Sequence, residues 1–341
     1  MSNDMGDLTS MAKTTQTRNG KGFEYACLKA LKAACTELTV KIDERDSPAL
    51  NSAKNCFESL ETQEQSKFCI AAQAPIPFLM DCEPNLNDAD DPSLLSIGLQ
   101  SDSEGQAGDV RDVLLYRVDP KKQTRNWECG ISCKHNHDAT KHPRINFKPP
   151  VKDLFATSWA PSFTMQQEYF DACEEVYELC KTDIEQGELW TNVFSEDEIA
   201  SCVYKPINRG LMHSIDSLKT DSQFVYEFFS YCMGTRDFYK IIMQDKDNLT
   251  RLTVFNFSKT LGAPSKNIKK GRFKLNALPF PKRIISVAYV SDSTFHVNFD
   301  EGWAFSFRLH NADSKMKAVG LKYDIRLIGV PLCTANLVFR W

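Results

Sequence analysis

The sequence has no long apolar run. No stretch approaches the about 18 consecutive apolar residues that a membrane-spanning helix needs, and the first residues, Met1 to Asp4, lack the basic and apolar regions of a signal peptide. We therefore expect a soluble protein that is not exported, has no membrane partner and acts in the cytoplasm.

Without a signal peptide, we do not expect the 12 cysteines of the sequence to reach an oxidising compartment, where they would pair. Because the cytosol keeps thiols reduced, we expect free cysteines rather than disulfide bridges. A free cysteine inside a helix behaves as a small buried hydrophobe. The cysteines that fall in helical patterns are Cys27, Cys35, Cys56, Cys173 and Cys180.

Neither apolar nor charged residues are depleted. At 42% and 25% of the chain, both lie near the averages of globular domains, which excludes a wholly disordered, collagenous or coiled-coil protein. The 341 residues are enough for two domains of about 150 residues each, or for one elaborated α/β domain.

Acidic residues are scarce towards the end of the chain. Residues 265–341 hold 13 Lys and Arg against 5 Asp and Glu, a net +8, so the total of −4 leaves −12 for residues 1–264. Residues 121–148 hold 7 basic and 2 acidic residues, a net +5. Basic patches on an acidic chain indicate a polyanionic partner such as nucleic acid, because neutralised phosphates release condensed counterions. A solvated basic surface is the alternative.

Helical periodicity characterises the first part of the chain. Residues 1–18 are polar and aperiodic, which predicts a disordered tail. Apolar residues then recur at helical spacing over residues 22–38. Pro48, after the capping candidate Ser47, predicts a second helix to about residue 60, and a third is expected at 63–74. The acidic stretch 81–109, rich in Asn, Pro and Gly, is predicted to be a long surface loop.

A period of two characterises other segments. The predicted strands are residues 112–118, 127–134, 238–243, 252–257 and four runs between 284 and 328. Helical segments are predicted between the strands 127–134 and 238–243, from residue 164 to about residue 231. The last four strands alternate so regularly that we expect one buried face and one face with hydrogen-bond donors and positive charge. That face suits the reading of base edges in a major groove, with an ordinary solvated face as the alternative.

Two segments carry groups that suit phosphodiester chemistry. Asp109 and Asp112 stand at the start of the strand 112–118, and Ser132 and Lys134 share one face of the next strand. A hairpin would bring Asp112 and Lys134 together. Carboxylates beside a lysine suit hydrolysis in which Mg²⁺ lowers the pKa of a water and an ammonium neutralises developing charge. Ordinary solvation and turn residues are the alternative interpretation.

The order of these groups resembles a known nuclease pattern. An acid heads one strand, a lysine ends the next, and a preceding helix carries a glutamate, as in the PD-(D/E)xK nucleases. Four blocks, residues 19–26, 108–113, 130–142 and 302–312, are similar to type II restriction endonucleases of the HaeIII type. The block Ser132-Cys-Lys-His-Asn-His137 is the most specific of these, and the resemblance covers nearly the whole chain.

The resemblance implies an α/β (α+β) fold. It predicts a PD-(D/E)xK nuclease core with a mixed sheet flanked by helices, and a β-rich C-terminal part that reads DNA. The expected regions are a tail at 1–18, the nuclease core at 19–160, a helical connector at 161–235 and the DNA-recognition region at 236–341.

The resemblance also implies an activity. It predicts cleavage of double-stranded DNA at a short palindrome, GC-rich like GGCC, in a bacterial restriction-modification system. Mg²⁺ is the expected cofactor, with Mn²⁺ able to substitute. Because a palindrome has two-fold symmetry, a homodimer on DNA is expected, with a monomer that reads both halves as the alternative.

Individual roles follow from the resemblance. Asp112 matches the metal ligand at the head of the strand, Lys134 the catalytic lysine and Glu24 the helix carboxylate, while Asp109 is an alternative ligand. Ser132 stands where the family-wide pattern has an acid.

The missing charge at Ser132 leaves two possibilities. Glu24, Glu128 or Asp109 supplies it, or the Cys133 carbonyl and the Ser132 hydroxyl complete a single-metal site.

DNA contacts are expected after the second strand and in the basic C-terminal region. Arg308 and Asn311 are candidates for base reading, and the alternative is that they pair with Asp313 or Asp324 and hold a turn together. The full set of expected contacts is Asn136, His137, Lys141, Arg144, Ser306, Arg308, Asn311, Lys315, Lys317, Lys322 and Arg326.

Two other classes of protein are weighed. A zinc-stabilised DNA-binding module without nuclease activity could use Cys129, Cys133, His135 and His137, but the short His-x-His spacing is unlike that of structural zinc sites. A base-modifying enzyme acting on a flipped base lacks a Gly-rich nucleotide loop here.

Overall fold

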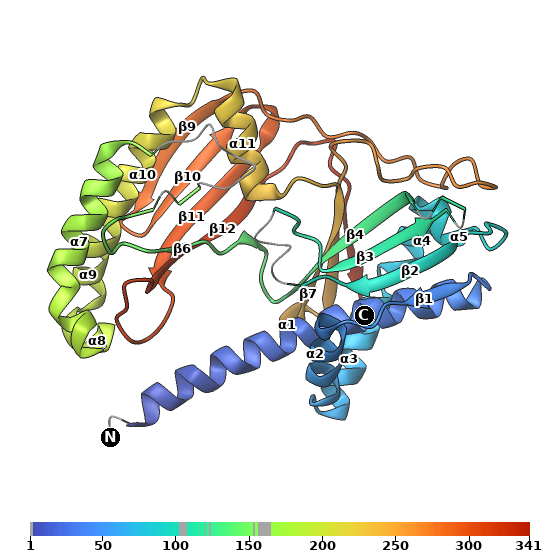
Figure 1. Ribbon diagram of the computed structural model, residues 1–341, viewed down its shortest axis with the longest axis horizontal. Helices are drawn as coiled ribbons and strands as arrows, with labels where there is room; N and C mark the ends of the chain where they lie inside the picture. The colour runs from blue at the N-terminus through green and yellow to red at the C-terminus, as the bar shows by residue number, and fades with distance from the viewer. Residues whose placement is uncertain (1–2, 102–107, 120, 123, 153, 156–164) are drawn as a thin grey trace. The chain divides into compact units, whose positions relative to one another are not determined.

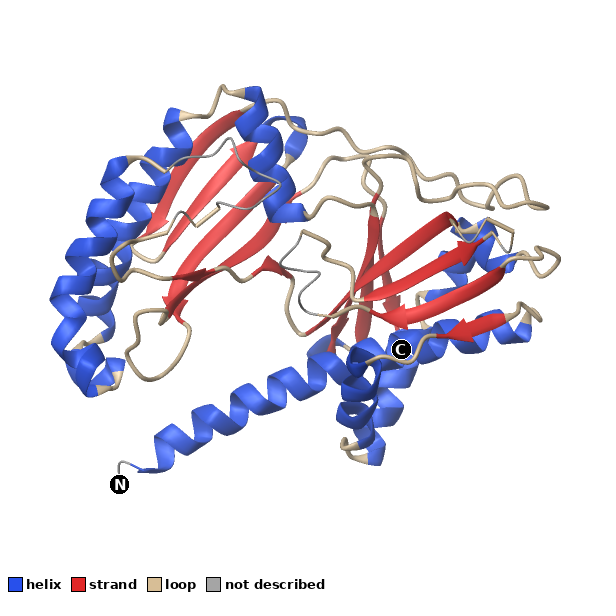
Figure 2. Ribbon diagram, in the orientation of Figure 1, coloured by secondary structure: helices blue, strands red, loops and turns tan. Residues whose placement is uncertain are grey.

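The chain forms two compact units in a computed structural model, which describes residues 3–101, 108–119, 121–122, 124–152, 154–155 and 165–341 (Figure 1). The first unit comprises residues 1–138, 235–278 and 333–341, and the second comprises residues 139–234 and 279–332. Each unit is built around its own sheet (Figure 2). Among the described residues, no helix is both long and apolar enough to cross a membrane.

The first unit contains a mixed seven-stranded sheet with the order β1-β2-β3-β4-β7-β8-β13. Its strands are β1 (Ile42–Glu44), β2 (Leu94–Leu99), β3 (Val113–Val118), β4 (Arg125–His135), β7 (Phe238–Gln244), β8 (Leu249–Phe255) and β13 (Asn336–Arg340). The pairs β1–β2 and β4–β7 are parallel and the other neighbours are antiparallel.

Helices of the first unit cover one face of this sheet. They are α1 (Asn3–Glu37), α2 (Pro48–Glu58), α3 (Thr62–Gln73), α4 (Ile76–Cys82) and α5 (Pro84–Asn87), and a 3₁₀ turn (Asp245–Asp247) follows β7. Phe23, Cys27 and Leu31 of α1 recur at helical spacing and are buried in the same core as Cys129 and Cys133 of β4. The opposite face of β4 is therefore left to Glu128, Gly130, Ser132 and Lys134.

The second unit contains a sheet with the order β5-β12-β11-β10-β9, in which β6 also pairs with β12. Its strands are β5 (Ala139–Lys141), β6 (Arg144–Ile145), β9 (Ile284–Ser291), β10 (Thr294–Phe299), β11 (Ala304–Asn311) and β12 (Leu321–Gly329). Its helices are α7 (Gln167–Gln186), α8 (Trp190–Val193), α9 (Glu196–Ile199), a π-helical turn (Ala200–Tyr204), α10 (Lys205–Ser217), α11 (Ser222–Met233) and a 3₁₀ turn (Asp300–Gly302).

Aromatic rings fill the core of the second unit. Phe228 of α11 stacks on Phe307 of β11 with ring centroids 5.8 Å apart, and Phe307 stacks on Phe295 of β10 at 4.9 Å. Phe307 and Phe295 occupy buried positions of the alternating strands. The predicted buried face is therefore confirmed for β10, β11 and the first part of β12, but not for β9, in which only Ile284 is buried.

Most predicted elements are present, and the mixed α/β class is confirmed. The second and third helices correspond to α2 and α3, and the Ser47 hydroxyl accepts a hydrogen bond from the Leu50 N–H at 3.1 Å, as a helix cap does. All 12 cysteines are free, as expected. Thr164, the expected start of the long helix, lies outside the described residues.

Two local predictions were wrong. The helix α1 begins at Asn3, within the expected tail, because residues 3–18 contain no proline that would stop it from extending backwards. The predicted loop 81–109 contains the end of α4, the short α5 and the buried strand β2. Its apolar run, Leu94 to Leu99, was obscured by the acidic residues around it.

The structure also divides the chain differently from the expected consecutive regions. β7, expected in the DNA-recognition region, pairs with β4, and β8, expected there too, pairs with β7, in the sheet that carries Asp112 and Lys134. The helices of 167–233 belong instead to the same unit as β9 to β12. Strands satisfy their backbone hydrogen bonds by pairing with a neighbouring strand, and that neighbour can be distant in the sequence.

Candidate active site

Asp112 lies at the start of β3, where the β3–β4 pairing fixes its backbone. Its N–H donates to the Ile131 carbonyl at 2.7 Å. Its carboxylate Oδ2 accepts from the Cys133 backbone N–H at 2.6 Å, from Lys134 Nζ at 3.2 Å and from the Ser132 hydroxyl at 3.3 Å. The predicted meeting of Asp112 and Lys134 across a hairpin is confirmed.

Glu24 approaches this pair from α1. It is 8% exposed and accepts a hydrogen bond from Lys21 Nζ at 3.2 Å. Burial, reinforced by the negative charge of Asp112, raises the pKa of Glu24 to about 7, although Lys21 and Lys134 act in the opposite direction. The two carboxylates are therefore close enough to interact electrostatically.

Lys134 keeps its charge in this position. Burial by itself lowers the pKa of Lys134, but the carboxylates of Asp112 and Glu24 outweigh it and leave the pKa raised. Its side chain is one-fifth exposed. A permanent cation thus stands beside the two carboxylates.

Cys133 contributes only backbone groups to this cluster. Its side chain lies in the core with Cys27, and burial raises the pKa of the Cys133 thiol well above its usual value. The thiol is therefore not suited to bind a metal, while the Cys133 carbonyl stays a predicted ligand. The backbone N–H of Cys133 instead orients Asp112.

Lys240 is a neighbour that sequence reasoning missed. It lies on β7 opposite Ser132 in the parallel register, is 5% exposed and donates to the Asp138 carbonyl at 2.5 Å. Burial, followed by the charge of Lys134, lowers the pKa of Lys240 to about 7. A single lysine inside the apolar run Phe238–Met243 was the signal that could have identified it.

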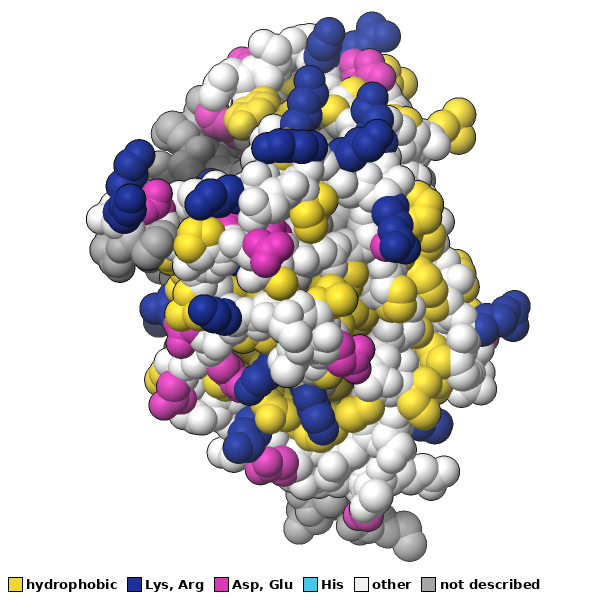
Figure 3. Space-filling view, turned by 90° about the vertical axis from the view of Figure 1, so that its right-hand side faces the viewer, with side chains coloured by type: hydrophobic (Ala, Val, Ile, Leu, Met, Phe, Trp, Pro, Cys, Tyr) yellow, Lys and Arg dark blue, Asp and Glu magenta, His cyan; other side chains and the backbone are white. Residues whose placement is uncertain are grey.

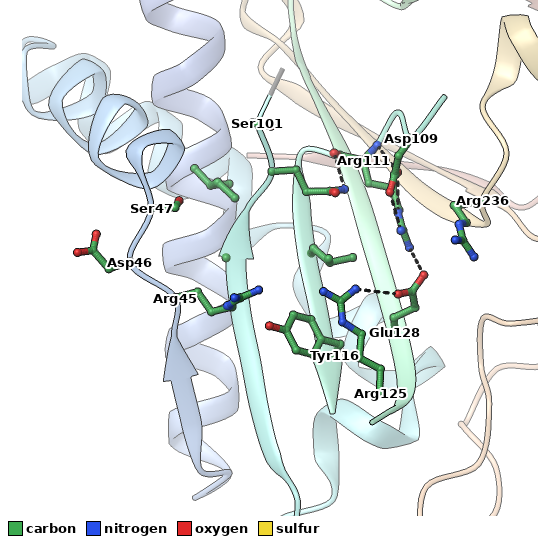
Figure 4. A pocket seen from close by; sticks show the side chains of 14 residues that line it. Arg45, Asp46, Ser47, Ser101, Asp109, Arg111, Tyr116, Arg125, Glu128 and Arg236 are labelled. Atoms are coloured by element: carbon green, nitrogen blue, oxygen red, sulfur yellow. Dashed lines mark hydrogen bonds and ion pairs between the residues drawn. The ribbon is translucent and has the colours of Figure 1, made fainter. Parts of the chain in front are cut away.

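Asp109 is engaged away from this cluster, in a second network (Figure 4). Its carboxylate receives two hydrogen bonds from the Arg111 guanidinium, at 2.8 Å from Nε and 2.7 Å from Nη2. Arg111 Nη1 also pairs with Glu128 Oε1 at 3.1 Å. Arg111 keeps the pKa of Asp109 below its usual value, although burial acts in the opposite direction. This geometry favours Asp112 over Asp109 and Glu128 as a ligand.

Gly130 makes room for this second network. A Cβ on Gly130 would lie 2.0 Å from Cδ of Arg111 and 2.9 Å from its Cβ. The Arg111 side chain, 5% exposed, therefore crosses β4 directly above the glycine. Arg111 and Gly130 together fasten the segment that precedes Asp112 onto β4, a role that no residue pattern in the sequence revealed.

The donor set suits a hard cation better than zinc. Asp112, Glu24 and Ser132 offer oxygen atoms, which Mg²⁺ prefers. Within the part of the chain that the structure describes, no three His, Cys, Asp or Glu side chains are grouped to hold a metal. Cys129 and Cys133 both point into the core, so the alternative zinc site is not formed there.

Comparison with known proteins decides the family. The family model for the HaeIII restriction endonuclease matches residues 20–331. The chain belongs to the HaeIII restriction endonuclease family. A relative, the Type II restriction enzyme HaeIII of Haemophilus aegyptius, is 31% identical over 328 residues, which cover 95% of this chain and 97% of the relative. No solved structure matches the chain. Membership of this family gives DNA cleavage as the class of activity.

Some residues that we expected to contact DNA in this HaeIII-family chain form hydrogen bonds within the protein instead. The Asn136 amide donates to Asp245 Oδ2 at 2.7 Å and accepts from the Asp245 N–H at 2.9 Å, while His135 bonds the same carboxylate at 2.7 Å. Asn136 has a positive φ of 58°. Its side chain thus stabilises the turn after β4, and His137, which follows it, is half-buried.

The polar face of β11 and β12 carries most of the other candidates. Arg308 and Arg326 are exposed, and Ser306 lies opposite Arg326 in the register. Arg308 lies opposite Asp324 but makes no ion pair among the described residues. Asn311 accepts from the Tyr204 hydroxyl at 2.9 Å. The alternative pairing of Arg308 and Asn311 with aspartates is therefore not observed among these residues.

Asp324 is the acid at the centre of this face. It lies 2.7 Å from His142 Nδ1, 3.2 Å from His310 Nε2 and 3.8 Å from Arg326 Nη2. Burial by itself would raise the pKa of Asp324, but the hydrogen bonds and charges of the two histidines outweigh burial and hold this pKa well below its usual range. Four positive or potentially positive groups, with Arg308 among them, therefore surround one carboxylate.

The remaining candidates lie around the same sheet. Arg144 pairs with Asp313 at 3.1 Å, and Lys317 lies 3.9 Å from the same Asp313 carboxylate. Lys141 lies over the Tyr231 ring at 4.0 Å. Lys315 is exposed and Lys322 is half-buried.

Proposed function

We propose that this chain is a Mg²⁺-dependent type II restriction endonuclease that hydrolyses double-stranded DNA at a short palindromic, GC-rich site. The observation that carries the proposal is the contact of the Asp112 carboxylate with Lys134, with Glu24 beside them, in a chain of the HaeIII family. The arrangement supports a PD-(D/E)xK site in which Glu24 replaces the acid missing at Ser132. The bacterial cytoplasm is the expected location.

Asp112 and Glu24 are the residues that would hold Mg²⁺, with the Ser132 hydroxyl beside them. Mg²⁺ is commonly bound by one or two carboxylates and completed by substrate phosphates, and Mn²⁺ accepts the same oxygen ligands. When bound, the ion supplies an activated water and stabilises charge on the phosphate. Burial and then the charge of Asp112 raise the pKa of Glu24, and a divalent cation bound between the two carboxylates would favour the ionised form of Glu24.

Groups of the protein itself orient the Asp112 carboxylate and neutralise charge on the phosphate. The Cys133 N–H and Ser132 hydroxyl fix the direction of the Asp112 carboxylate. The Lys134 ammonium is placed to neutralise the negative charge that develops on the phosphate during hydrolysis. Because the two carboxylates keep it protonated, it provides this charge at every pH at which they are ionised.

Specificity is assigned to the polar face of the second unit. Arg308, exposed and without an ion pair among the described residues, has the five donors that recognise guanine N7 and O6 in the major groove. Arg326 and Lys322 share its face and are suited to phosphates. We infer a homodimer on DNA, because two copies related by two-fold symmetry would read the two halves of a palindrome.

The test is digestion of bacteriophage DNA by purified protein with Mg²⁺, with Mn²⁺, or with EDTA. Discrete fragments that require the metal are expected. DNA that is bound but stays intact in Mg²⁺ would overturn the nuclease proposal. The mass of a complex formed in Ca²⁺ gives the number of chains per duplex, and one chain would overturn the dimer.

A further inference from the structure

Three hollows of the first unit share lining residues, the first on the sheet face that carries Glu128 and the third beside Asn85 of α5. Their volumes are about 420, 310 and 420 Å³. The first and second share Arg111, Arg125 and Glu128, and the second and third share Asn126 and Trp127. The three hollows are therefore neighbours, and together we call them the groove, from Arg111 in the first to Lys266 in the third.

Four arginines line the first part of this groove, and two of them have no acidic partner among the described residues. Arg45 and Arg236 are exposed and make no ion pair within the described ranges of the chain. The Arg45 guanidinium carbon lies 5.6 Å from the centre of the Tyr116 ring; that of Arg125 lies 4.1 Å from the same ring, and Arg125 also pairs with Glu128 at 3.3 Å (Figure 4). Stacking on an aromatic ring holds a guanidinium in place while its N–H groups stay available.

A basic strap continues from the far end of the groove. We define it as residues 265–274, in the connection between β8 and β9. It contains five cations and no acid, and all five side chains are exposed. They are Lys266, Lys269, Lys270, Arg272 and Lys274. The view in Figure 3, from the right-hand side of Figure 1, shows Lys and Arg side chains gathered in the upper part of that face.

The strap is anchored to the unit rather than loosely attached. Asn267 donates to both carboxylate oxygens of Asp88 at 2.9 Å, and the Arg272 N–H donates to the Asp81 carbonyl at 2.7 Å. Gly271 lies so close to α4 that a Cβ would be 2.6 Å from the Cys82 carbonyl oxygen. An anchored backbone with exposed cationic side chains is an arrangement for binding, because less conformational entropy has to be given up when a ligand arrives.

The position of the strap relative to Asp112 sets what it can reach. Arg117, near the end of β3, donates to the Asp88 carbonyl at 2.8 Å, and Asp88 in turn holds the strap through Asn267. Asp112 precedes the other end of β3. Six residues of strand at about 3.4 Å each place roughly 20 Å between these ends. That length matches about six base pairs of duplex at 3.4 Å per phosphate along each strand.

We propose that the groove and the basic strap bind the sugar-phosphate backbone of duplex DNA outside the base pairs that are read and cut. The inference rests on the proposed nuclease function and adds a sequence-independent site to it. The occupant is a duplex because its phosphates are regularly spaced, strongly acidic and delivered by the substrate itself. Binding there raises affinity for all sequences and leaves base discrimination unchanged.

The test uses two cognate duplexes, of about 12 and about 30 base pairs at 3.4 Å per step, with binding measured in Ca²⁺. The strap variant carries Lys269→Ala, Lys270→Ala and Lys274→Ala. The matched control carries Lys29→Ala, Lys54→Ala and Lys181→Ala, three exposed lysines on helices. A second variant, Arg45→Ala with Arg236→Ala, tests the groove.

The strap variant is expected to lose at least tenfold in affinity for the long duplex and little for the short one. Its plot of log affinity against log salt should be shallower by about 2 to 3 units, because each phosphate that is no longer neutralised lowers the slope by about 0.9. The groove variant should lose about 2 units by the same rule. The control should match wild type.

Three results would overturn the proposal. They are an unchanged salt slope, an equal loss on both duplexes for the strap variant, and an equal loss in the control. Loss of binding to phosphatidylserine vesicles with unchanged binding to DNA would assign the strap to a membrane surface instead. Wild-type protein that neither binds nor cuts either duplex would refute the nuclease function itself, a result separate from all of these.

Discussion

At the residue scale, the candidate chemistry depends on Asp112 and Lys134. Lys134→Ala and Asp112→Asn should each lower the rate of DNA cleavage by at least about 10²- to 10³-fold, the usual cost of removing a preorganised charge from a reacting phosphate. Specific binding in Ca²⁺ should persist, because neither side chain is assigned to base reading. Single-turnover cleavage and a binding titration measure both properties.

Asp109→Asn is the comparison for that experiment. Because Asp109 is held by Arg111, it should lower the free energy of unfolding and reduce cleavage less than Asp112→Asn. A dead Asp109→Asn beside an active Asp112→Asn would transfer the ligand role to Asp109.

The packing of Arg111 over Gly130 predicts a loss of stability when Gly130 is replaced. Gly130→Ala should cost about 1 to 3 kcal/mol of stability, because the new Cβ overlaps Arg111 and must displace it. Displaced Arg111 would release the segment before Asp112, so cleavage should fall as well. Thermal unfolding and single-turnover rates are the measurements.

Gly20 offers the matched control for Gly130. It lies inside α1, and a Cβ there would meet nothing within 4 Å. Gly20→Ala should therefore stabilise the protein by about 0.5 to 1 kcal/mol through helix propensity. Equal behaviour of the two alanine variants would contradict the close packing of Arg111 over Gly130.

At the element scale, Arg117 fastens the segment between α4 and β2 to β3. It is 1% exposed and donates to the carbonyls of Asn85, Ser93 and Asp88 at 2.7 to 2.8 Å. Arg117→Met should cost about 3 kcal/mol or more, since it leaves three buried acceptors without donors. Chemical denaturation of the variant measures the loss.

The conservative change at the same position separates charge from geometry. Arg117→Lys keeps the charge, but an ammonium cannot reproduce the planar fork that spans three carbonyls, so most of the loss should remain. Full recovery of stability in Arg117→Lys would show that charge alone matters. Because Asp88 also holds the basic strap, both variants should lower affinity for the long duplex.

At the scale of the whole molecule, Glu83 links stability to pH. It is fully buried, accepts from the Tyr239 hydroxyl at 2.7 Å and the Gly262 N–H at 2.8 Å, and its charge acts on the thiols of Cys82 and Cys129. Burial raises the pKa of Glu83 to about 7, above its value of 4.5 in an unfolded chain, while these hydrogen bonds act in the opposite direction.

The sign of the pH effect follows from that shift. Between about pH 4.5 and 7 the folded protein holds a proton on Glu83 that the unfolded chain has released, so this residue's contribution to stability falls as pH rises. The full difference is at most about 3 kcal/mol. Glu83→Gln should flatten this slope, measured by denaturation at a series of pH values. An unchanged slope would contradict the raised pKa.

The sequence could indicate the local part of this architecture. Periods of 3.6 and 2 specified most helices and strands, because each burial pattern repeats over neighbouring residues. The approach of Asp112 to Lys134 was also predictable, since a short antiparallel connection brings the two ends of a hairpin together. β2 was missed because acidic and turn-forming residues surround its short apolar run.

The family motifs, by contrast, located groups that local reasoning could not connect. Glu24 stands 88 residues before Asp112, and only the resemblance placed it in the site. The structure then supplied the physical link, because α1 packs against β4 and carries Glu24 to the end of that strand.

By itself, the sequence determined the periodic elements, the reduced cysteines, the basic C-terminal region and the hairpin that joins Asp112 to Lys134. Only the tertiary structure decided that β7 inserts Lys240 beside Ser132, that Arg111 crosses Gly130 to hold Asp109, and that the chain alternates between two units. Hydrophobic periodicity is a property of adjacent residues, whereas strand partners and the room above a glycine depend on segments distant in sequence that meet only in the folded chain.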